Sequence, residues 1–588
     1  MNRLLPYFKK YRLRSIMAPL FKCLEACFEL FVPLVVADMI DTGIRTQDVS
    51  YIVSRGALLL LLAFIGLACS ITAQYFAATA AAGIGRSISD SLFSHIMDLG
   101  YKEIDDIGTA KLLTRISSDV TRVQTGINMF LRLFMRSPFI VFGSVIMAFT
   151  VDPGSAMIFV GLVIVLMIIV FGILIGTMPY YNKVQQSMDR VTLLTRETMS
   201  GQRVIRAFNR QEKEKSDFLE ENGRLLHFQL FAGKISALMN PLTLAAVNIG
   251  IVCLLYTGAM QVNIGSLTQG ETIALVNYMN QILVELIKLA NLIILISRAL
   301  TSMNRINEIM DVENSMDKND RKARVFSSEN EAAPADTPYM EFRNVSFSYN
   351  DNKAMALTDI SFSLDKGESI GIIGGTGSGK STLINLIPRF YEVSSGSILI
   401  NGRDLRELDR KELRSRIGLV PQKAGLFAMS LKDNLRLGAP DASEDALLKA
   451  MEDAQGSEIL TIKKGGLDAA IEQDGRNLSG GQRQRVTIAR ALARDPEILI
   501  LDDAASALDF ATDARLRKAL KNYSGRMTVF IVSQRVSAVR DCDSIIVLQN
   551  GHMAGMGKHK ELLLGCPTYR EICETQMTRE EVERDEIA

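Results

Sequence analysis

The first three hundred positions of the chain carry long apolar runs, and the remainder alternates between shorter apolar runs and polar segments. A helix that crosses a lipid bilayer needs about 20 mostly apolar residues. Runs of that length predict membrane-spanning helices at about 16–40, 56–82, 128–150, 155–178, 241–261 and 272–297. We therefore expect an α-helical domain with six membrane-spanning helices over residues 1–310.

Charged residues interrupt the first and the last of these runs: Lys22, Glu25, Glu29, Asp38, Glu285 and Lys288. Charges at membrane depth are costly unless they face the interior of a helix bundle or water. Glu285 and Lys288 are three residues apart and share a helical face, so we expect them to form an ion pair. Candidates for lining a polar cavity are Lys22, Glu25, Glu29, Arg132 and Arg136.

The segments that connect the apolar runs alternate in length and charge. Three are short and hold a single basic residue, Arg45, whereas 86–127 and 182–234 are long and polar, and the latter holds ten Lys or Arg residues. The positive-inside rule therefore places the long segments and both termini in the cytoplasm. Apolar positions recur at helical spacing within these segments, so we expect the spanning helices to continue beyond the bilayer.

From Tyr339 onward, short strand-like runs alternate with helical patterns, which indicates an α/β domain over 339–575. The polar stretch 311–338 is interpreted as a linker, and 576–588 as a charged C-terminal tail. The net charge is +1 and the chain has no block of basic residues, so we expect no nucleic-acid partner. The composition thus combines a membrane domain with a polar α/β domain in one chain.

A complete phosphate-binding loop, G-x-x-x-x-G-K-[ST], follows the strand-like run 369–373 and precedes a helical pattern. Its residues are Gly374, Gly375, Thr376, Gly377, Ser378, Gly379, Lys380 and Ser381. Backbone N–H groups of such a loop cradle phosphate oxygens. Lys380 would neutralise β- and γ-phosphate charge, and Ser381 would ligate Mg²⁺. The motif in this context predicts a nucleoside triphosphate site.

Two further motifs follow in the order of an ATP-hydrolysing domain. The first is formed by Leu478, Ser479, Gly480, Gly481 and Gln482, directly before a helical run. Sixteen residues later an apolar strand begins that ends in Asp502, a Walker B pattern. The L-S-G-G-Q sequence alone is a weak signal, but between a phosphate loop and a Walker B strand it is specific.

Together these motifs resemble those of the ATP-binding cassette (ABC) transporters, in the exporter arrangement that fuses six spans to one nucleotide-binding domain. The resemblance covers residues 1 to about 575. It implies an α-helical membrane domain, extended into the cytoplasm, fused to an α/β P-loop domain. It also implies ATP and Mg²⁺ as cofactors, and ATP hydrolysis coupled to export of a small molecule, lipid or peptide across the cytoplasmic membrane. The nucleotide-binding domain would be cytoplasmic.

The resemblance assigns roles to further residues. Tyr349 matches the aromatic residue that stacks on adenine, and Thr382 extends the phosphate loop. Gln422 matches the glutamine that senses Mg²⁺, and Asp502 would hold Mg²⁺ through water. The D-loop would consist of Ser506, Ala507, Leu508 and Asp509. Segments 104–109 and 201–210 resemble the two cytoplasmic coupling helices, whereas the sequence around Glu472 departs from the pattern that exporters of this kind usually have there.

Two positions depart from the family pattern. Asp503 stands where the family carries a glutamate that polarises the attacking water, and its carboxylate reaches about 1.5 Å less far. Gln534 stands where a histidine is expected, and an amide cannot exchange a proton near neutral pH. Both catalytic positions are therefore degenerate, which predicts a site that binds ATP but hydrolyses it poorly.

The signature Leu478–Gln482, in contrast, is intact. In these transporters ATP lies between the phosphate loop of one subunit and the signature of the other. The pattern therefore resembles the degenerate-site subunit of heterodimeric bacterial multidrug-type exporters, with a second ABC half-transporter as partner. Two alternatives remain: a homodimeric exporter with slow ATPase activity, and a membrane-bound ATP sensor that transports nothing. An importer is disfavoured because importers usually carry the two domains on separate chains.

Overall fold

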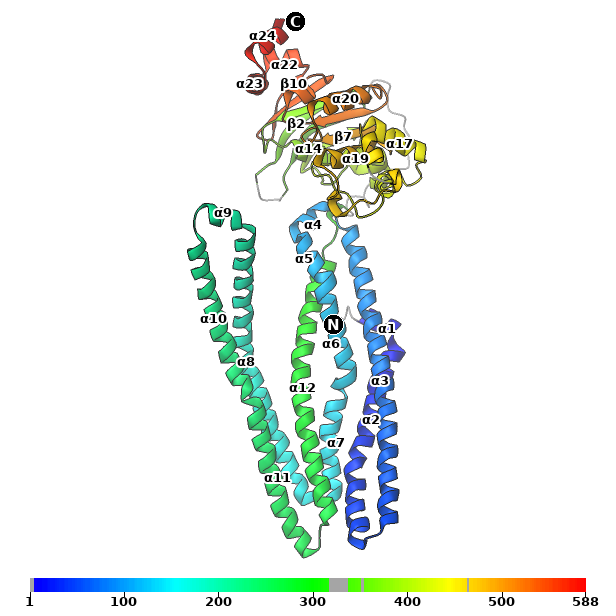
Figure 1. Cartoon of the computed structure of the whole chain (residues 1–588), viewed down its shortest axis with the longest axis vertical. Helices are drawn as coiled ribbons and strands as arrows, with labels where there is room; N and C mark the ends of the chain where they lie inside the picture. The colour runs from blue at the N-terminus through cyan, green and yellow to red at the C-terminus, as the bar shows by residue number, and fades with distance from the viewer. Residues whose placement is uncertain (1–4, 317–336, 350–353, 463–464, 588) are drawn as a thin grey trace. The chain divides into compact units, whose positions relative to one another are not determined.

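The computed structural model describes residues 5–316, 337–349, 354–462 and 465–587 (Figure 1). These residues divide into two compact units. The first comprises Met1–Met97 and Thr109–Val312, and the second comprises Asp98–Gly108 and Glu313–Ala588. Most of the expected linker at 311–338 lies outside the described residues. Each unit is described by itself below.

The secondary-structure elements described in the first unit are all helices. It contains α1 (Leu5–Lys10), α2 (Arg12–Asp38), η1 (Met39–Ile44), α3 (Val49–Asp98), α5 (Thr109–Thr114), η2 (Arg115–Asp119), α6 (Val120–Met129), η3 (Phe130–Phe134), α7 (Arg136–Val151), α8 (Pro153–Ser200), α9 (Gln202–Ala207), α10 (Gln211–Ala237), α11 (Met239–Ile264) and α12 (Gln269–Met310). The segments from α5 to α7 follow one another with a single turn residue, Met135, between η3 and α7. A single turn residue, Leu238, likewise separates α10 from α11.

Among the described residues, four helices are long and apolar enough to cross a membrane: Val49–Asp98, Thr109–Val151, Pro153–Ser200 and Gln211–Ile264. They contain the four expected spans that are free of charge clusters. The other two expected spans, 16–40 and 272–297, lie mainly on α2 and α12. Both helices are long and carry several charged residues.

Polar residues at the turns fix where the spanning helices begin. Asp152 accepts a hydrogen bond from the Ser155 backbone N–H at 2.6 Å and Pro153 occupies the first helical position of α8. Thr268 and Glu271 form a capping box at the start of α12. With 50 residues in α3 and 48 in α8, these helices are about 75 and 72 Å long, far more than the ~30 Å apolar core of a bilayer. The expected extension of the helices beyond the membrane is confirmed.

The second unit is α/β. Its strands are β1 (Met340–Phe347), β2 (Leu357–Leu364), β3 (Ser369–Gly374), β4 (Ser395–Ile400), β5 (Arg403–Asp404), β6 (Ile417–Val420), β7 (Ile498–Asp502), β8 (Thr528–Val532), β9 (Ser544–Gln549) and β10 (His552–Gly557). Within the described residues one sheet has the order β2-β1-β4-β5 and is antiparallel. The other has the order β10-β9-β3-β8-β7-β6 and is parallel except at β10.

Helices surround these sheets. They are α4 (Tyr101–Ile107), α14 (Lys380–Leu386), η4 (Leu405–Glu407), α15 (Arg410–Ser415), α16 (Leu431–Arg436), α17 (Glu444–Asp453), α18 (Ser457–Ile462), η5 (Gly466–Asp468), η6 (Gln473–Gly475), α19 (Gly480–Leu492), α20 (Phe510–Lys521), α21 (Val536–Val539), α22 (His559–Gly565), α23 (Pro567–Gln576) and α24 (Arg579–Ile587). The segment 576–588, expected as a charged tail, thus contains a helix, and its Val582 is buried.

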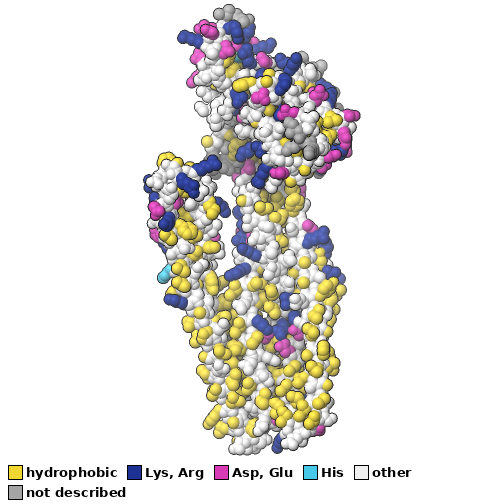
Figure 2. All heavy atoms as spheres, in the orientation of Figure 1, with side chains coloured by type: hydrophobic (Ala, Val, Ile, Leu, Met, Phe, Trp, Pro, Cys, Tyr) yellow, Lys and Arg dark blue, Asp and Glu magenta, His cyan; other side chains and the backbone are white. Residues whose placement is uncertain are grey.

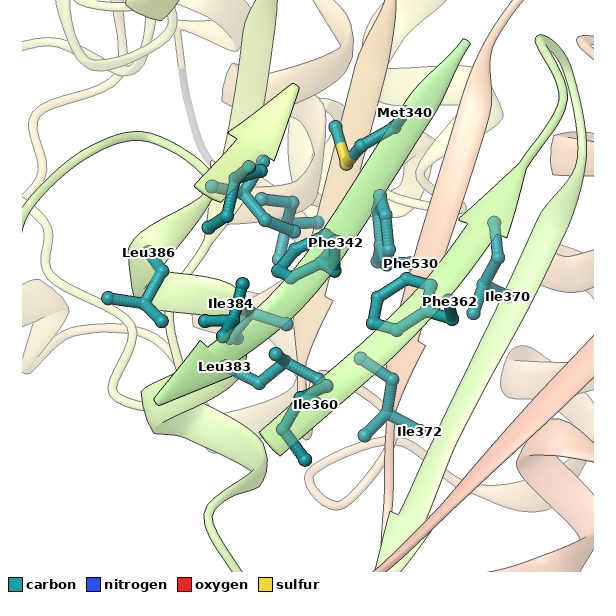
Figure 3. Packing of buried hydrophobic residues seen from close by; sticks show 14 of the residues in the cluster. Met340, Phe342, Ile360, Phe362, Ile370, Ile372, Leu383, Ile384, Leu386 and Phe530 are labelled. Carbon is teal, nitrogen blue, oxygen red and sulfur yellow. The ribbon is translucent and has the colours of Figure 1, made fainter. Parts of the chain in front are cut away.

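The main hydrophobic core of this unit lies between the two sheets (Figure 3). Phe342 from β1 stacks on Phe362 from β2 with ring centroids 4.3 Å apart, and Ile372 and Phe530 reach the same cluster from the parallel sheet. Leu383 on α14 also belongs to it. Because β3 and α14 are anchored in this core, the loop between them is held at the end of the central strand.

Candidate nucleotide-binding site

The phosphate loop connects β3, a central strand of the parallel sheet, to α14. The ammonium group of Lys380 lies inside the loop, because its Nζ donates to the carbonyl oxygens of Gly374 and Gly375, each at 2.7 Å. Burial lowers the pKa of Lys380, and the nearby carboxylates of Asp503 and Asp502 oppose that change. A phosphate group would supply the negative charge that this half-buried ammonium lacks.

Glycine is required at two positions of this loop. Gly377 has a φ of 79° and Gly379 a φ of 99°, both in the left-handed region that favours glycine. At Gly379 a Cβ atom would also lie 2.7 Å from Leu357 Cδ2 and 2.9 Å from the Ala356 carbonyl oxygen. The loop can therefore turn its backbone toward a ligand only with these residues.

Oxygen ligands for a divalent cation meet beside the loop. The Ser381 hydroxyl donates to Asp502 Oδ1 at 3.2 Å, which joins the start of α14 to the end of β7. Hydroxyl and carboxylate oxygens are the ligands that Mg²⁺ prefers. Burial raises the pKa of Asp502, and the neighbouring Asp503 raises it further. These oxygen donors fit Mg²⁺, whose positive charge would offset the cost of keeping the buried Asp502 carboxylate ionised.

Tyr349 lies next to the phosphate loop, although the sequence separates them by more than twenty residues. Its hydroxyl is 3.0 Å from Thr382 Oγ1, on the first turn of α14. The ring makes edge contacts with Phe347 and Tyr391, with centroids 4.9 and 5.2 Å away. The side chain remains 42% exposed, so part of its surface is accessible to a ligand.

The strand register brings the remaining candidates to the same sheet edge. Asp502 is paired with Val532, and Val532 with Ile372, in parallel strands. Residues directly after these strands therefore lie at one carboxyl edge, which is where ligands bind in such sheets. Gln534 follows β8 by two residues and is exposed, and Gln422 follows β6 in the same way and is also exposed.

Asp503 has an unusual backbone conformation. Its φ is 49°, a value that residues other than glycine rarely adopt. Its N–H donates to the Val532 carbonyl oxygen at 3.0 Å, and its own carbonyl oxygen accepts from the Ser506 hydroxyl at 2.8 Å. The backbone at Asp503 is thus fixed on both sides, and the reach of its side chain is set by its own length.

The signature forms the N-terminus of α19. Ser479 and Gln482 build a capping box, in which the Gln482 N–H donates to Ser479 Oγ at 3.2 Å and the Ser479 N–H donates to Gln482 Oε1 at 3.0 Å. Leu478 is buried beneath them, whereas Gly480 is open. The exposed face of this turn is therefore backbone and hydroxyl.

The D-loop packs against the signature within the same chain. A Cβ atom on Gly481 would lie 3.1 Å from the Ala507 carbonyl oxygen. Asp509 then caps α20, because the Thr512 N–H donates to its Oδ1 at 2.9 Å. These hydrogen bonds with Thr512 lower the pKa of Asp509. Ser506 and Leu508 complete the loop, and Leu508 is buried.

Comparison with known proteins places this geometry in a family. The sequence profile of the ABC transporter transmembrane region matches residues 15–286, and that of the ABC transporter domain matches 357–506. An uncharacterized ABC transporter ATP-binding protein of Mycobacterium tuberculosis is 33% identical over 575 residues, covering 97% of each chain. This chain belongs to the ABC transporters.

Further relatives agree with the full-length match. The uncharacterized ABC transporter ATP-binding protein YfiB of Bacillus subtilis is 32% identical over 580 residues, covering 99% of each chain. An ATP-dependent lipid A-core flippase of Syntrophus aciditrophicus is 30% identical over 521 residues, covering 87% of this chain and 84% of its own. A bacterial Atm1-family ABC exporter with ATP bound shares the fold, with a TM-score of 0.79 at 22% identity, covering 97% of this chain and 99% of its own. The protein is an ABC exporter with its transmembrane and ATP-binding domains fused.

In this ABC exporter the short helix α4 contacts the nucleotide-binding fold, and both belong to the second unit. The Tyr391 hydroxyl donates to Asp105 Oδ2 at 2.5 Å, and the rings of Tyr101 and Phe390 lie 4.4 Å apart. Tyr391 also contacts the ring of Tyr349. The expected coupling segment 104–109 overlaps α4, and 201–210 contains α9.

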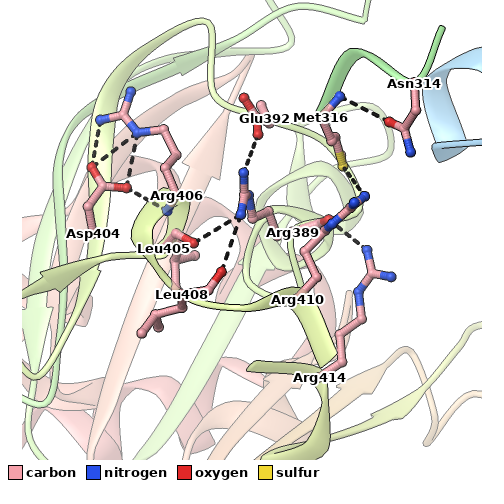
Figure 4. A network of polar contacts seen from close by, with 10 residues as sticks. All are labelled: Asn314, Met316, Arg389, Glu392, Asp404, Leu405, Arg406, Leu408, Arg410 and Arg414. Atoms are coloured by element: carbon pink, nitrogen blue, oxygen red, sulfur yellow. Dashed lines mark hydrogen bonds and ion pairs between the residues drawn. The ribbon is translucent and has the colours of Figure 1, made fainter. Parts of the chain in front are cut away.

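The backbone around this contact is held by a polar network that Figure 4 shows. Arg389 is 2% exposed, and its guanidinium donates to Glu392 Oε1 at 2.6 Å. The guanidinium of Arg414 donates to the carbonyl oxygen of Arg389 at 2.9 Å. Asn314, just after the first unit, donates to the Asp98 carbonyl oxygen at 2.6 Å. Sequence reasoning missed these residues, because no motif marks them.

In the membrane unit of the exporter, a few blue and magenta side chains lie among apolar ones (Figure 2), and several of the charged residues form ion pairs. Arg136 donates to Glu285 Oε1 at 2.5 Å and to Glu29 Oε2 at 2.6 Å. Lys288 donates to Glu285 at 2.8 Å, so the expected pair is confirmed. Lys22 donates to Glu25 at 2.6 Å.

A cavity of about 380 Å³ lies beside this ion-pair cluster. Glu29, Glu285 and Lys288 line it together with the amide side chains of Asn277 and Gln281. Of the residues expected to line a polar cavity, Glu29 lines this one and also pairs with Arg136. Lys22 and Glu25 form an ion pair with each other.

Proposed function

We propose that this ABC exporter is one subunit of a heterodimer. Its phosphate loop would form an ATP site with impaired hydrolysis, and its L-S-G-G-Q signature would complete the competent site of a second half-transporter. The observation that carries the proposal is the contrast between Asp503 and Gln534, both departures from the family pattern, and an intact, fully capped signature turn at Ser479.

ATP would be held by the residues that surround the phosphate loop. Lys380 would bind β- and γ-phosphate oxygens, Tyr349 would stack on adenine, and Mg²⁺ would be held by Ser381 and Asp502, with Gln422 as a further ligand. The 2.7 Å contacts of Lys380 and the 3.2 Å contact between Ser381 and Asp502 support these roles. When bound, Mg²⁺ neutralises phosphate charge.

The impaired hydrolysis follows from reach and proton chemistry. A general base must lie within hydrogen-bond distance of the attacking water. Asp503 is one methylene shorter than glutamate, and the hydrogen bonds of its backbone to Val532 and Ser506 prevent it from moving closer. Gln534 can donate a hydrogen bond to the γ-phosphate, but its amide exchanges no proton near neutral pH.

The partner subunit would supply a glutamate and a histidine at the matching positions. It would also receive the exposed Ser479 hydroxyl and the open backbone at Gly480 against its own γ-phosphate. The transporter would lie in the cell membrane with both termini and the nucleotide-binding domain in the cytoplasm. Its cargo would be a small molecule, lipid or peptide.

The test is purification of the chain alone and together with the adjacent-gene half-transporter. Under the proposal the chain alone hydrolyses ATP slowly, and the co-purified pair hydrolyses it at least about tenfold faster, since general-base catalysis is worth about 10²–10⁴-fold. Vanadate trapping with radiolabelled ATP should then label the partner's site. A stable homodimer whose rate equals that of the pair would contradict the heterodimer and favour the slow homodimer.

A further inference from the structure

The last residue of helix α23 forms hydrogen bonds with the backbone on both sides of Arg535, directly after Gln534. Gln576, its last residue, donates from Nε2 to the Gln534 carbonyl oxygen at 2.7 Å. Its Oε1 accepts a hydrogen bond from the Val536 N–H at 2.9 Å. One side-chain amide thus satisfies a carbonyl group and an N–H group of the same short segment.

The Val536 N–H, which Gln576 binds in this pair of hydrogen bonds (the Gln576 clip), has no acceptor inside its own helix. Val536 is the first residue of α21, and the first N–H groups of a helix lack intrahelical acceptors. Arg535, which precedes it, makes no side-chain capping hydrogen bond. Gln576 therefore acts as a cap supplied from a distant part of the chain, and it fixes where α21 begins.

The helix that carries Gln576 is itself firmly seated. Tyr569 and Cys573 of α23 are 0% exposed and belong to a hydrophobic cluster with Val536 and Val539 of α21. The Tyr569 hydroxyl is 2.7 Å from His559 Nδ1. Because α23 is anchored through buried side chains, its terminal amide has a defined position, although the amide itself is exposed.

The other end of the segment is held by the central strand. The Ser533 N–H donates to the Ile372 carbonyl oxygen at 3.1 Å, and Ser533 Oγ accepts from the Arg535 N–H at 3.0 Å. Gln534 is thus fixed on its N-terminal side by β3, the strand that leads into the phosphate loop. On its C-terminal side it is fixed by Gln576.

We propose that Gln576 is a positioning residue that aims the side chain of Gln534 at the γ-phosphate of ATP bound to this subunit. The inference rests on the proposed function, since it requires that Gln534 contact nucleotide. With the clip present, the peptide plane after Gln534 is held and its side chain leaves the backbone in one direction. Without it, the segment between Ser533 and α21 can rotate, and the contact to the phosphate is made only part of the time.

The experiment uses the full transporter with its partner subunit, in which the phosphate-loop lysine of the partner is changed to alanine so that this subunit's site dominates binding. Dissociation of Mg²⁺ and a fluorescent ATP analogue is followed by stopped flow. We expect Gln576→Ala to speed release by about three- to tenfold. Gln576→Glu still accepts a hydrogen bond from the Val536 N–H but cannot donate to the Gln534 carbonyl oxygen. Its release rate should therefore lie between those of the unaltered transporter and Gln576→Ala.

A matched control is Glu574→Gln on the same helix. Glu574 forms an ion pair with Arg570 on the same helix, and within the described part of the chain no hydrogen bond or ion pair joins it to segment 533–536. It should release nucleotide at the unaltered rate. Because Gln576 caps α21, Gln576→Ala should lower the melting temperature of the nucleotide-free transporter by about 2–4 °C relative to this control, so release is measured well below both melting temperatures.

A double-variant cycle separates the inference from its foundation. If Gln576 acts through Gln534, then Gln576→Ala should add nothing to Gln534→Ala, since the side chain being aimed is already gone. If Gln534→Ala alone leaves release unchanged, then Gln534 does not contact nucleotide and the proposed function fails at that residue. If Gln534→Ala speeds release but Gln576→Ala does not, or if the two effects are additive, the positioning role of Gln576 is wrong.

Discussion

The phosphate-loop side and the signature side of the nucleotide-binding unit can be compared residue by residue. The phosphate-loop side holds the residues proposed to bind ATP and Mg²⁺, but Asp503 and Gln534 stand where the resemblance to the family leads us to expect a glutamate and a histidine. On the signature side, Ser479 and Gln482 satisfy each other's backbone and Gly481 packs on the D-loop. In a homodimer, both ATP sites would combine the same phosphate-loop side with the same signature side. In the proposed heterodimer the two sides of this chain serve different ATP molecules, so they can differ in their fitness for hydrolysis.

The largest effect should come from damage to the signature. Ser479→Arg removes the hydroxyl and places a long cation at the turn that would close over the partner's ATP. We expect ATP turnover of the complex to fall by about 100-fold or more, the range for loss of one oxyanion-type donor. Ser443→Arg is the control for helix capping, because the Ser443 hydroxyl accepts a hydrogen bond from the Ala446 N–H at the start of α17 without belonging to the signature. Equal losses in the two variants would mean that only helix capping was disturbed.

A smaller effect, of opposite sign, should follow from repairing the phosphate-loop side. Asp503→Glu with Gln534→His restores reach and proton exchange together, and we expect at least a tenfold gain within the ~10²–10⁴-fold range of general-base catalysis. The measurement is ATPase activity in a complex whose partner glutamate is changed to glutamine. Each single replacement should give little, because such groups act as a unit.

No gain from the double replacement, even after the partner's signature is made L-S-G-G-Q, would show that these two residues do not silence the site. That outcome would remove the chemical difference between the two sides.

Loss of the phosphate-loop lysine should matter less for turnover than loss of the signature. Lys380→Ala removes the charge held by the carbonyl oxygens of Gly374 and Gly375, so nucleotide binding at this site should weaken. Turnover of the complex should fall by no more than about threefold, since in the proposed heterodimer the fast site would need this subunit's signature rather than its base. Lys449→Ala, an exposed lysine on α17, is the control. A drop equal to that from the partner's corresponding lysine would make the two sites equivalent.

The smallest effect concerns stability. Burial raises the pKa of Asp502 above its ordinary value of 3.8, so the folded protein holds this proton more tightly than the unfolded chain does. The free energy of unfolding therefore falls as pH rises from the pKa of the unfolded chain through the raised pKa of the folded state, and the full cost is present above the folded-state pKa. Asp502→Asn should raise the melting temperature of the nucleotide-free transporter by about 2 °C and abolish added stabilisation by Mg²⁺. A melting temperature that falls at pH 7 would mean that the charge is compensated.

Local patterns in the sequence were sufficient to predict most of the fold. Apolar runs predict the long helices, and the motif 374–381 predicts a loop between a strand and a helix, as observed at β3 and α14. The contact between Tyr391 and Asp105 could not be predicted, because the two residues are 286 positions apart and neither belongs to a motif. Gln576 likewise lies at the start of a segment whose composition indicates only a charged tail.

The membrane unit shows the same limit of prediction. The ion pair of Glu285 and Lys288 follows from helical spacing. The bridge from Arg136 to Glu285, in contrast, joins residues on two helices that are 149 positions apart in the sequence. Spacing within one helix decides the first contact, and packing between helices decides the second. Sequence periodicity therefore predicts which charges turn inward but not which of them meet.

The length of α8 has a mechanical consequence. This 48-residue helix packs along α10 and α11 (Figure 1), and the short α9 closes the hairpin at one end. A rod of about 72 Å that turns by about 10° about one end carries its other end through about 12 Å. For a given rotation, the displacement of the far end of the hairpin is therefore proportional to the number of residues along it. Deleting two matched turns from α8 and α10 would shorten the stroke while leaving every residue around the phosphate loop unchanged.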